Sequence, residues 1–263
     1  MNIGFIGAGN MGGALARAIS KVSGTKVYIY DKIEEKAMAL AKEIGGTFSD
    51  FDFIIGTCDF VFLGVKPNGI SEVCARIGKQ NENKPIIVSM AAGVKIEKIE
   101  ASLGADFKVI RIMPNTPVAV GEGLTAYSKN TLVSKNDVDN FERIMQYTGT
   151  TEAINEDKID AFCAIAGCGP AYAYMFIDAL ANGGEKCGLS RERAIIYASK
   201  MIRGAALMAL ESGLDPETLK RNVCSPGGST IEGVKVLEAK DFPADVSDAI
   251  EAAFNRTKEL GKQ

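Results

Sequence analysis

The 263-residue sequence contains no histidine and no tryptophan. Without an imidazole, the chain cannot use a histidine general base, a serine–histidine–aspartate triad or a histidine-ligated catalytic metal. Cysteines stand at positions 58, 74, 163, 168, 187 and 224, and no two of them form a C-x-x-C pair. That spacing argues against zinc and thioredoxin-like sites, so we predict no metal site and reduced thiols in a cytoplasmic protein.

The sequence also lacks any strongly basic segment. Its 30 basic and 33 acidic side chains give a net charge of −3, which argues against nucleic acid and anionic membranes as partners. The first residues lack the basic region and cleavage site of a signal peptide, and no apolar run approaches the ~20 residues needed to span a bilayer. We therefore expect a cytoplasmic protein that binds neither nucleic acid nor membrane.

The first part of the chain alternates strands with segments of helical periodicity. Strands are predicted at Ile3–Gly7, Lys26–Tyr30, Phe60–Val65, Ile86–Ser89, Val109–Met113, Leu124–Ser128 and Thr150–Ala153. Helices are predicted at Asn10–Ser20, Glu34–Ile44 and Ile96–Leu103, and from the capping box that begins at Ser134 to Tyr147. This alternation predicts an α/β domain with a parallel, doubly wound, Rossmann-type sheet over residues 1–155.

The second part of the chain contains only helical patterns. Helices are predicted at Ile159–Ala166, Tyr172–Asn182, Arg191–Ser212, Glu217–Asn222, Ile231–Glu238 and Ala244–Leu260. The apolar stretch 204–210 consists largely of small residues and must be buried against another surface. Because about 110 residues offer limited interior, contact between subunits is favoured over a self-contained bundle. We therefore predict an all-α dimerisation domain over residues 156–263.

A glycine-rich turn follows the first predicted strand and opens the first helix. Its sequence is Gly7-Ala8-Gly9-Asn10-Met11-Gly12. Gly7 permits a tight turn, Gly9 lets the backbone approach a pyrophosphate, and Gly12 permits close packing of helix and strand. Because the cofactor phosphates would lie on the helix N-terminus, this context favours a dinucleotide site over a purely structural turn.

Asp31 ends the second predicted strand, about 20 residues after the glycines. An acid at that position binds the ribose hydroxyls of NAD and repels the 2′-phosphate of NADP. Lys32 could offset the repulsion, so NADPH and NADH both remain candidate cofactors, with Asp31 favouring NADH. The alternative is that Asp31 only caps the following helix.

Further candidate cofactor contacts follow three later strands. They are Val65, Lys66 and Pro67, then Ala92, then Asn115. All of them stand at the carboxyl ends of predicted strands, where α/β proteins bind ligands. Lys66 could face the cofactor or only solvate its loop, and the proline-bounded turn around Asn115 could be purely structural.

A second glycine-rich loop, Ser225–Thr230, runs directly into the predicted helix Ile231–Glu238. Such a loop presents unpaired backbone N–H groups at the positive end of the helix dipole, which attracts an anion. Two anion sites on one chain indicate a cofactor and a carboxylate-bearing substrate. The alternative is that the hydroxyl of Ser229 or Thr230 caps the helix, and both roles can coexist.

Taken together, these motifs resemble those of the pyrroline-5-carboxylate reductase family over essentially the whole chain. The similar segments are 64–67, 113–117, 167–172 and 219–238. The resemblance implies a Rossmann domain followed by a helical, substrate-binding dimerisation domain, with homodimers that often assemble into decamers. It further implies reduction of 1-pyrroline-5-carboxylate to L-proline by hydride transfer from NADPH or NADH, the last step of proline biosynthesis.

The resemblance also implies roles for individual residues. Thr230 is expected to bond the ring nitrogen of the substrate, while Ser229 and Gly228 hold the substrate carboxylate. Glu156 matches a position that contacts substrate, and Asn222 matches one that contacts cofactor. We interpret Thr230 as the catalytic residue, with positioning of the imine as its main role and proton transfer left open.

Three residues depart from the family pattern. Ala166 replaces a usual serine, Phe51 lies near a usual cofactor-contacting asparagine, and Asp31 replaces the small or basic residues of NADPH-preferring members. The chemistry nevertheless suits a chain without histidine. A cyclic imine is basic enough to be protonated near neutrality, so positioning and hydrogen bonding suffice for its reduction.

Two other functions are compatible with the first glycine-rich turn. A β-hydroxyacid dehydrogenase would need a catalytic lysine shortly after a Gly-x-Gly helix start, but no lysine follows Gly169 before Lys186. A non-catalytic NAD-binding sensor would not need the second anion-binding loop. Both features favour the reductase.

Overall fold

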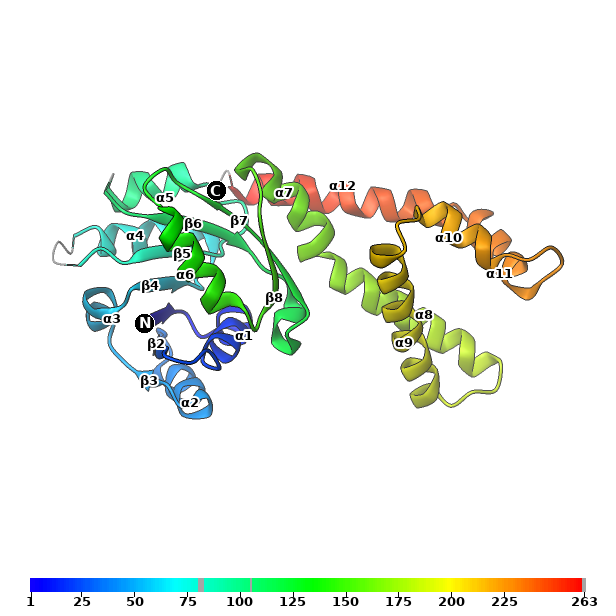
Figure 1. Cartoon of the computed structure of the whole chain (residues 1–263), viewed down its shortest axis with the longest axis horizontal. Coiled ribbons are helices and arrows are strands. Elements are labelled where there is room, and N and C mark those ends of the chain that lie inside the picture. Colours follow the sequence, from blue (N-terminus) through cyan, green and yellow to red (C-terminus); the bar gives the residue numbers. More distant parts are fainter. Residues whose placement is uncertain (80–82, 105, 262–263) are drawn as a thin grey trace. The chain divides into compact units, whose positions relative to one another are not determined.

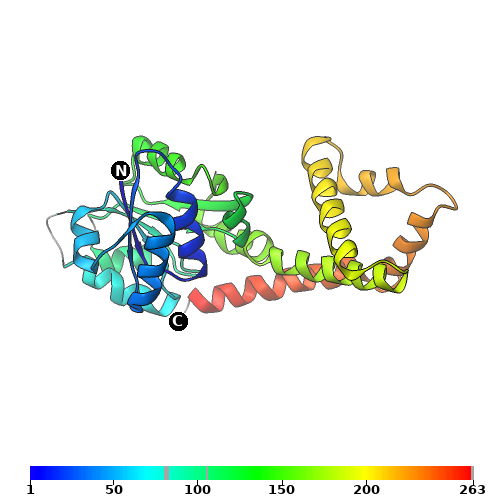
Figure 2. The ribbon, with the colours of Figure 1, turned by 90° about the horizontal axis from the view of Figure 1, so that it is seen from below.

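The structure of the chain, a computed structural model, describes residues 1–79, 83–104 and 106–261. It divides into two compact units, of which the first holds Met1–Pro170 with Ala253–Gln263 and the second holds Ala171–Ala252. Both the N-terminus and the last described turn of the chain therefore belong to the first unit (Figures 1 and 2). The predicted division after residue 155 stays a prediction, and residues 262 and 263 of the predicted second domain lie outside the described residues.

The first unit is built on a mixed eight-stranded sheet with the order β3-β2-β1-β4-β5-β6-β7-β8 (Figure 1). Its strands are β1 (Asn2–Ile6), β2 (Lys26–Tyr30), β3 (Thr47–Phe48), β4 (Phe60–Leu63), β5 (Ile86–Ser89), β6 (Val109–Met113), β7 (Gly123–Lys129) and β8 (Gly149–Ala153). The strand order reverses beside β1, which places the ligand-binding switch point between β1 and β4. The predicted Rossmann-type fold is confirmed.

Strands β7 and β8 depart from the predicted parallel sheet, because β7 pairs antiparallel with β6 and β8 pairs parallel with β7. A parallel connection needs a crossover of about a dozen residues or more, usually a helix. The chain between β6 and β7 contains only a short turn with the 3-10 helix η2 (Thr116–Val120). That turn is too short for a crossover, so the chain reverses direction.

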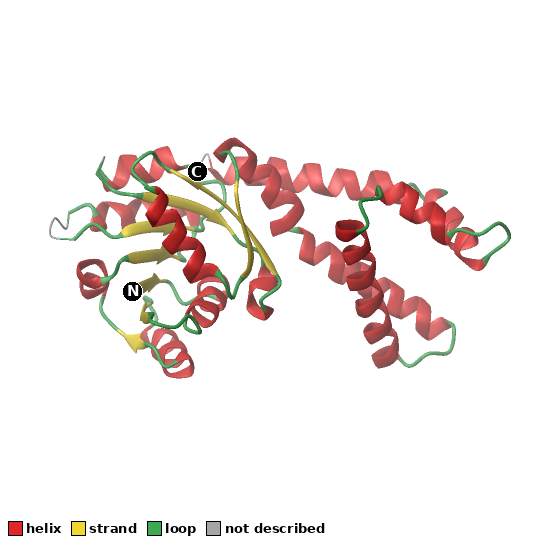
Figure 3. Cartoon of the chain, viewed as in Figure 1, coloured by secondary structure: helices red, strands yellow, loops and turns green. Residues whose placement is uncertain are grey.

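Helices cover both faces of the sheet, as the strands enclosed by helices in Figure 3 show. They are α1 (Asn10–Ile19), α2 (Glu34–Ile44), α3 (Phe51–Thr57), α4 (Ile70–Ile77), α5 (Ile96–Leu103) and α6 (Lys135–Met145). One core cluster includes residues of α1, α2 and α6, and the other includes residues of α3, α4 and α5. Strands β4, β5 and β6 are buried at every position because apolar side chains meet helices on both faces.

Three elements of this unit were absent from the sequence-based prediction, namely β3, α3 and α4. Helix α3 begins after Asp50, whose Oδ1 accepts the N–H of Phe53 at 2.7 Å, an N-cap signal that the sequence contains. Helix α4 buries Ile70, Val73 and Ile77, a spacing typical of one helix face. Both helices help to form the candidate site described below.

The described part of the second unit contains helices and no strand. Before it, α7 (Ile159–Phe162) and the π-helix η4 (Cys163–Gly167) still belong to the first unit. The second unit holds most of α8 (Gly169–Lys186), then α9 (Arg191–Glu211), α10 (Pro216–Val223), α11 (Ser229–Glu238) and the first part of α12 (Phe242–Gly261), whose last residues return to the first unit. The side chain of Ser190 accepts from Arg193 N and caps α9. Asp215 caps α10 in the same way, with Pro216 at the first helical position.

The prediction that no apolar run approaches membrane-spanning length is wrong for one segment. Among the described residues, the helical stretch Glu156–Lys186 is long and apolar enough to cross a membrane by length and composition, although only 11% of its most apolar window is buried in the single chain. Between Asp160 and Asp178 this stretch has no charged residue. Its apolar character is not obvious from the sequence, because many of its residues are alanine and glycine, not long aliphatic residues. Its exposed apolar surface requires a partner surface.

Candidate active site

The first glycine-rich turn is held by backbone packing that only glycine allows. Gly7 has a φ of +110°, and a Cβ on Gly7 would lie 2.7 Å from the carbonyl oxygen of Gly64. A Cβ on Gly12 would lie 2.3 Å from the carbonyl oxygen of Gly7. A Cβ on Gly9, in contrast, would meet no atom within 4 Å among the described residues, so its backbone borders open space.

Helix α1 begins at this turn without a side chain that blocks its N-terminus. Gly9 is the N-cap residue, the described part of the chain supplies no side-chain cap, and the first turn contains no acidic residue. The first N–H groups of the helix, at Asn10 to Gly12, therefore lack helical acceptors. They and the positive end of the helix dipole suit a phosphate.

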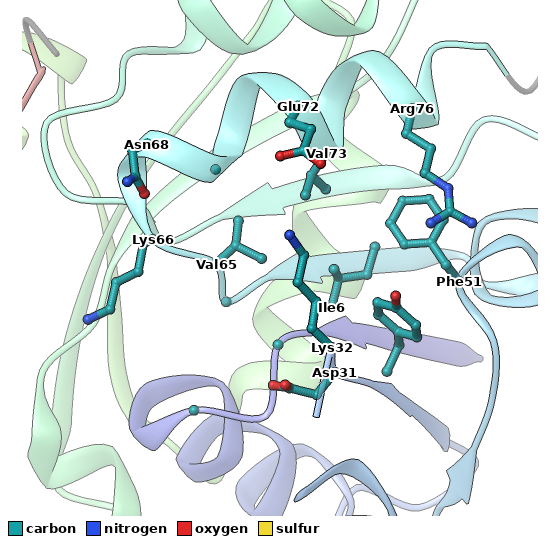
Figure 4. Close-up of a pocket in the computed structure, with 15 residues that line it drawn as sticks. Ile6, Asp31, Lys32, Phe51, Val65, Lys66, Asn68, Glu72, Val73 and Arg76 are labelled. Carbon is teal, nitrogen blue, oxygen red and sulfur yellow. The ribbon is translucent and has the colours of Figure 1, made fainter. Parts of the chain in front are cut away.

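Two cavities lie along this turn at the switch point of the sheet. The first, of about 380 Å³, includes Gly7, Gly9 and Asp31 in its lining (Figure 4). The second, of about 470 Å³, is lined by residues that include Asn10, Met11, Gly12, Pro67 and Ala92. Because both cavities include Gly9, Gly64, Val65 and Lys66, they form adjoining parts of one groove. Most of the predicted cofactor residues therefore come together.

Asp31 points toward the glycine-rich turn (Figure 4). Its Oδ2 accepts the N–H of Ala8 at 2.7 Å, and its Oδ1 accepts the N–H of Ile33 at 2.9 Å. Helix α2 has Ile33 as its N-cap residue, so Asp31 is not the cap that the alternative interpretation expected. Asp31 thus fixes the turn from the end of β2 and also lines the cavity.

Three basic residues, Lys32, Lys66 and Arg76, are among those that line the first cavity. The guanidinium of Arg76 lies 3.9 Å from the ring centroid of Phe51, and its Nη2 lies 3.0 Å from Oδ1 of Asp52. Lys32 points toward Glu72, whereas Lys66 points away from both (Figure 4). Arg76 was missed from the sequence because α4, which carries it, was not predicted.

Asn115 does not line either cavity. Its Oδ1 accepts the N–H of Leu124 at 2.9 Å, and its Nδ2 donates to the carbonyl oxygen of Ala166 at 3.0 Å. The buried amide therefore ties the β6–β7 turn to η4. This is the structural role that the sequence left open, and contact with cofactor stays a prediction.

Glu156 is engaged within the first unit. Its Oε1 accepts the N–H of Ile96 at 2.7 Å and lies 3.2 Å from Nη1 of Arg111, while Nη2 of Arg111 lies 2.7 Å from Oδ1 of Asp160. Arg111 is fully buried. These bonds fix the start of α5, and the predicted contact of Glu156 with substrate stays a prediction. An arginine within an otherwise apolar strand was the signal that sequence reasoning missed.

The second glycine-rich loop lies in the second unit. Gly227 has a φ of +72°, and the N–H of Gly228 donates to the carbonyl oxygen of Ser225 at 3.0 Å. Gly228 is the N-cap residue of α11, and within the described residues no side chain caps that helix. Ser229 and Thr230 occupy its first turn with exposed side chains, so their hydroxyls do not serve as its cap. Asn222, at the end of α10, is also exposed.

Burial makes three cysteines poor nucleophiles. It raises the pKa of Cys58 and Cys74 to about 12 and that of Cys163 to about 11. All six cysteines are free thiols. Among the described residues, no cluster of three or more cysteine and carboxylate side chains could hold a metal ion.

Two protein-family models match this chain, and each matched segment contains one of the two glycine-rich loops. Residues 156–260 match the family model for pyrroline-5-carboxylate reductase dimerisation, and residues 2–93 match the model described as NADP oxidoreductase, coenzyme F420-dependent. The chain is 41% identical to a pyrroline-5-carboxylate reductase of Aquifex aeolicus over 262 residues, covering 99% of this chain and 97% of that one. The Escherichia coli reductase is 36% identical, with coverage of 99% and 98%.

A solved structure is similar over its whole length. The crystal structure of the Plasmodium falciparum pyrroline carboxylate reductase with NADP bound superposes with a TM-score of 0.90 at 33% identity, covering 99% of this chain and 98% of the other.

Proposed function

Because the chain belongs to the pyrroline-5-carboxylate reductase family, we propose how its own residues serve the reaction of that family. The chain is an NAD(P)H-dependent reductase that converts 1-pyrroline-5-carboxylate to L-proline, the last step of proline biosynthesis. Similarity over 99% of the chain carries this assignment. The same similarity excludes the alternative function of a β-hydroxyacid dehydrogenase.

The groove at the switch point fits a nicotinamide dinucleotide. Gly9 leaves space for a pyrophosphate. Within the described residues, no capping side chain accepts a hydrogen bond from the first N–H groups of α1, so these groups can bind a phosphate. We propose that these groups bind the phosphates, while Val65, Lys66, Pro67 and Ala92 border the rest of the cofactor. When bound, the reduced nicotinamide supplies the hydride that the imine carbon accepts.

The N-terminus of α11 is the proposed carboxylate site. Ser229 presents its backbone N–H group to a substrate carboxylate, and such an interaction with a helix terminus contributes ~0.3–1 kcal/mol at an exposed position. Gly228, whose own N–H donates to the carbonyl oxygen of Ser225 at 3.0 Å, borders the carboxylate as the N-cap residue. The hydroxyl of Thr230, not engaged as a cap, bonds the ring nitrogen of the imine. The imine reacts in its protonated form, so addition of a hydride to the carbon leaves the nitrogen as a neutral amine without a further proton, and Thr230 acts by orienting the ring.

Both nicotinamide cofactors remain candidates, and we propose that Asp31 favours NADH. Each oxygen of its carboxylate accepts one backbone N–H and keeps a second lone pair for a ribose hydroxyl. A 2′-phosphate placed there would meet a negative charge, which Lys32 and Arg76 in the same cavity wall partly offset.

A homodimer is the proposed building block. Large apolar side chains of the helical segment are exposed in the single chain, including Tyr174 at 59%, Met175 at 72% and Leu210 at 81%. Large exposed apolar side chains in such number mark an interaction site. A second copy of the chain would cover it, in keeping with the match of this segment to a dimerisation model. Assembly of dimers into decamers and a cytoplasmic location stay predictions.

The decisive experiment is a reductase assay on the purified chain. We expect both NADH and NADPH to be oxidised when 1-pyrroline-5-carboxylate is added. The oxidation is measured as the loss of reduced-nicotinamide absorbance. Absence of turnover with both cofactors would overturn the assignment. Calorimetric titration with NADPH, alone and with proline present, separates an enzyme from a non-catalytic sensor, because a sensor need not couple the two ligands.

A further inference from the structure

The turn between β5 and α5 forms one wall of the cofactor groove. Ala91 and Ala92, in this turn, line the second cavity together with Met90. The next residue, Gly93, has a φ of +76°, a left-handed conformation that L side chains rarely adopt. The position of this wall therefore depends on what holds Gly93.

The last described turn of α12 lies directly against Gly93. A Cβ on Gly93 would come within 2.6 Å of the backbone nitrogen of Gly261 and 2.7 Å of the carbonyl oxygen of Thr257. A Cβ on Gly261 would lie 2.2 Å from the carbonyl oxygen of Gly93. Two glycines thus bring backbone against backbone, and Figure 1 shows this end of α12 beside α5.

Both partners in this contact are anchored. Thr257 is buried, and its hydroxyl contacts the carbonyl oxygen of Ala253 at 2.9 Å and Sγ of Cys163 at 4.0 Å. At the far end of the turn, the N–H of Ile96 donates to Oε1 of Glu156 at 2.7 Å. The turn is consequently fixed at its end by Glu156 and at its middle by Gly261.

We propose that Gly261 is a positioning residue for cofactor binding, because its backbone sets the place of Gly93 and hence of the Ala91–Ala92 wall. Gly261 itself touches neither cavity. The proposal rests on the assignment of the groove to a nicotinamide cofactor. It makes the C-terminal turn of α12 part of the machinery that binds the cofactor.

Gly261→Ala tests this role, because the added Cβ must separate the helix from the turn. We expect the KM for NADPH to rise about tenfold, with a smaller change in kcat at saturating NADPH, since displacement of a positioning contact by a fraction of an ångström weakens binding. A chain that ends at Leu260 removes the contact without adding a methyl group. It should show the same rise.

Gly56→Ala is the matched control. Gly56 is an exposed glycine in helix α3, and a Cβ added there would meet nothing within 4 Å among the described residues. The KM of the Gly56→Ala variant for NADPH should therefore match that of the wild type. Binding of NADPH is also measured directly by the change in its fluorescence, which does not require turnover. Either an unchanged KM and binding constant in Gly261→Ala, or wild-type values in the chain ending at Leu260, would overturn the proposal. Failure of the wild-type chain to reduce the imine would instead refute the proposed function.

Discussion

The carboxylate of Asp31 accepts the backbone N–H of Ala8 at 2.7 Å, so the acid that directly follows β2 also holds the glycine-rich turn. Its other oxygen accepts the N–H of Ile33, which orients the carboxylate from the opposite side. The proposed discrimination between cofactors and the shape of the glycine-rich turn therefore depend on one side chain. A substitution at this position must separate the two effects.

Asp31→Asn and Asp31→Ser form the appropriate pair. Asparagine keeps an acceptor for Ala8 but removes the charge, whereas serine removes both the charge and the reach of the side chain. We expect both variants to raise the ratio of kcat/KM for NADPH to that for NADH by about tenfold, which corresponds to ~1.4 kcal/mol of relieved repulsion. Serine should additionally raise both KM values, because the turn loses its hydrogen bond.

The measurement is the full kinetic comparison with both cofactors. An unchanged ratio in both variants would mean that the charge of Asp31 does not act on the adenosine ribose. A rise in both KM values with serine but not with asparagine would identify the bond to Ala8 as the element that shapes the turn.

Local sequence signals predicted most of the fold. Glycines 7, 9 and 12 located the groove, because the strand, the turn and the helix that they join follow one another directly in the chain. The capping box at Ser134 was equally local. The direction of β7 was not predicted, although the connection between β6 and β7 is too short for the crossover that parallel strands require.

Contacts between residues far apart in the chain could not be predicted from the sequence. Arg111 and Asp160 are far apart in the chain, as are Gly93 and Gly261, and no local pattern pairs them. Asn115 was predicted at the correct strand end, yet strand position alone does not decide whether an amide faces a ligand or a neighbouring turn. Chemistry-bearing residues were thus located more reliably than their partners.

Thr230→Ala tests the role of the hydroxyl in the reaction. Because this hydroxyl does not cap α11, its loss should leave the free energy of unfolding within ~0.5 kcal/mol of the wild type. Turnover of 1-pyrroline-5-carboxylate should fall by about 10- to 100-fold, as expected for loss of an orienting hydrogen bond. Thr230→Ser should restore much of the rate, because serine keeps the hydroxyl.

Thr218→Ala provides the matched control. Thr218 lies in the first turn of α10, where its hydroxyl donates to Oδ2 of Asp215 at 2.7 Å. Its loss should lower stability by ~0.5–1.5 kcal/mol while the rate of the folded enzyme is unchanged. If Thr230→Ala instead shows near-wild-type turnover, the hydroxyl has no part in orienting the imine.

Arg111→Met should be strongly destabilising. Arg111 is fully buried between the carboxylates of Glu156 and Asp160, at 3.2 and 2.7 Å respectively. Removal of the cation leaves both carboxylates without their charged partner, for which the expected cost is ~3–5 kcal/mol of unfolding free energy. Combination with Glu156→Gln and Asp160→Asn should recover part of that loss. Urea unfolding at a fixed protein concentration measures the loss of stability in the single variant and its recovery in the combined variant. Wild-type stability of the single variant would show that the cluster contributes little.

Asp137 should make a pH-dependent contribution to stability. Burial alone raises the pKa of this carboxyl, but hydrogen bonds from Lys108 and Ser134 outweigh it and bring the pKa below the ordinary value of 3.8. An acid with a lowered pKa in the folded state stabilises the fold above the ordinary pKa, and that stabilisation is lost as the pH falls through the folded-state pKa.

Asp137→Asn removes the charge while keeping an acceptor for the capping box at Ser134. At pH 7 the variant should be less stable by ~1 kcal/mol, and the difference from the wild type should shrink toward zero as the pH is lowered through the acid range. Asp139→Asn is the control, because its partner Lys135 is an exposed i,i+4 neighbour and the pair contributes only ~0.3–0.5 kcal/mol. A difference for Asp137→Asn that stays constant from pH 7 to well below 3.8 would contradict the assignment of this stability to its ionised carboxylate.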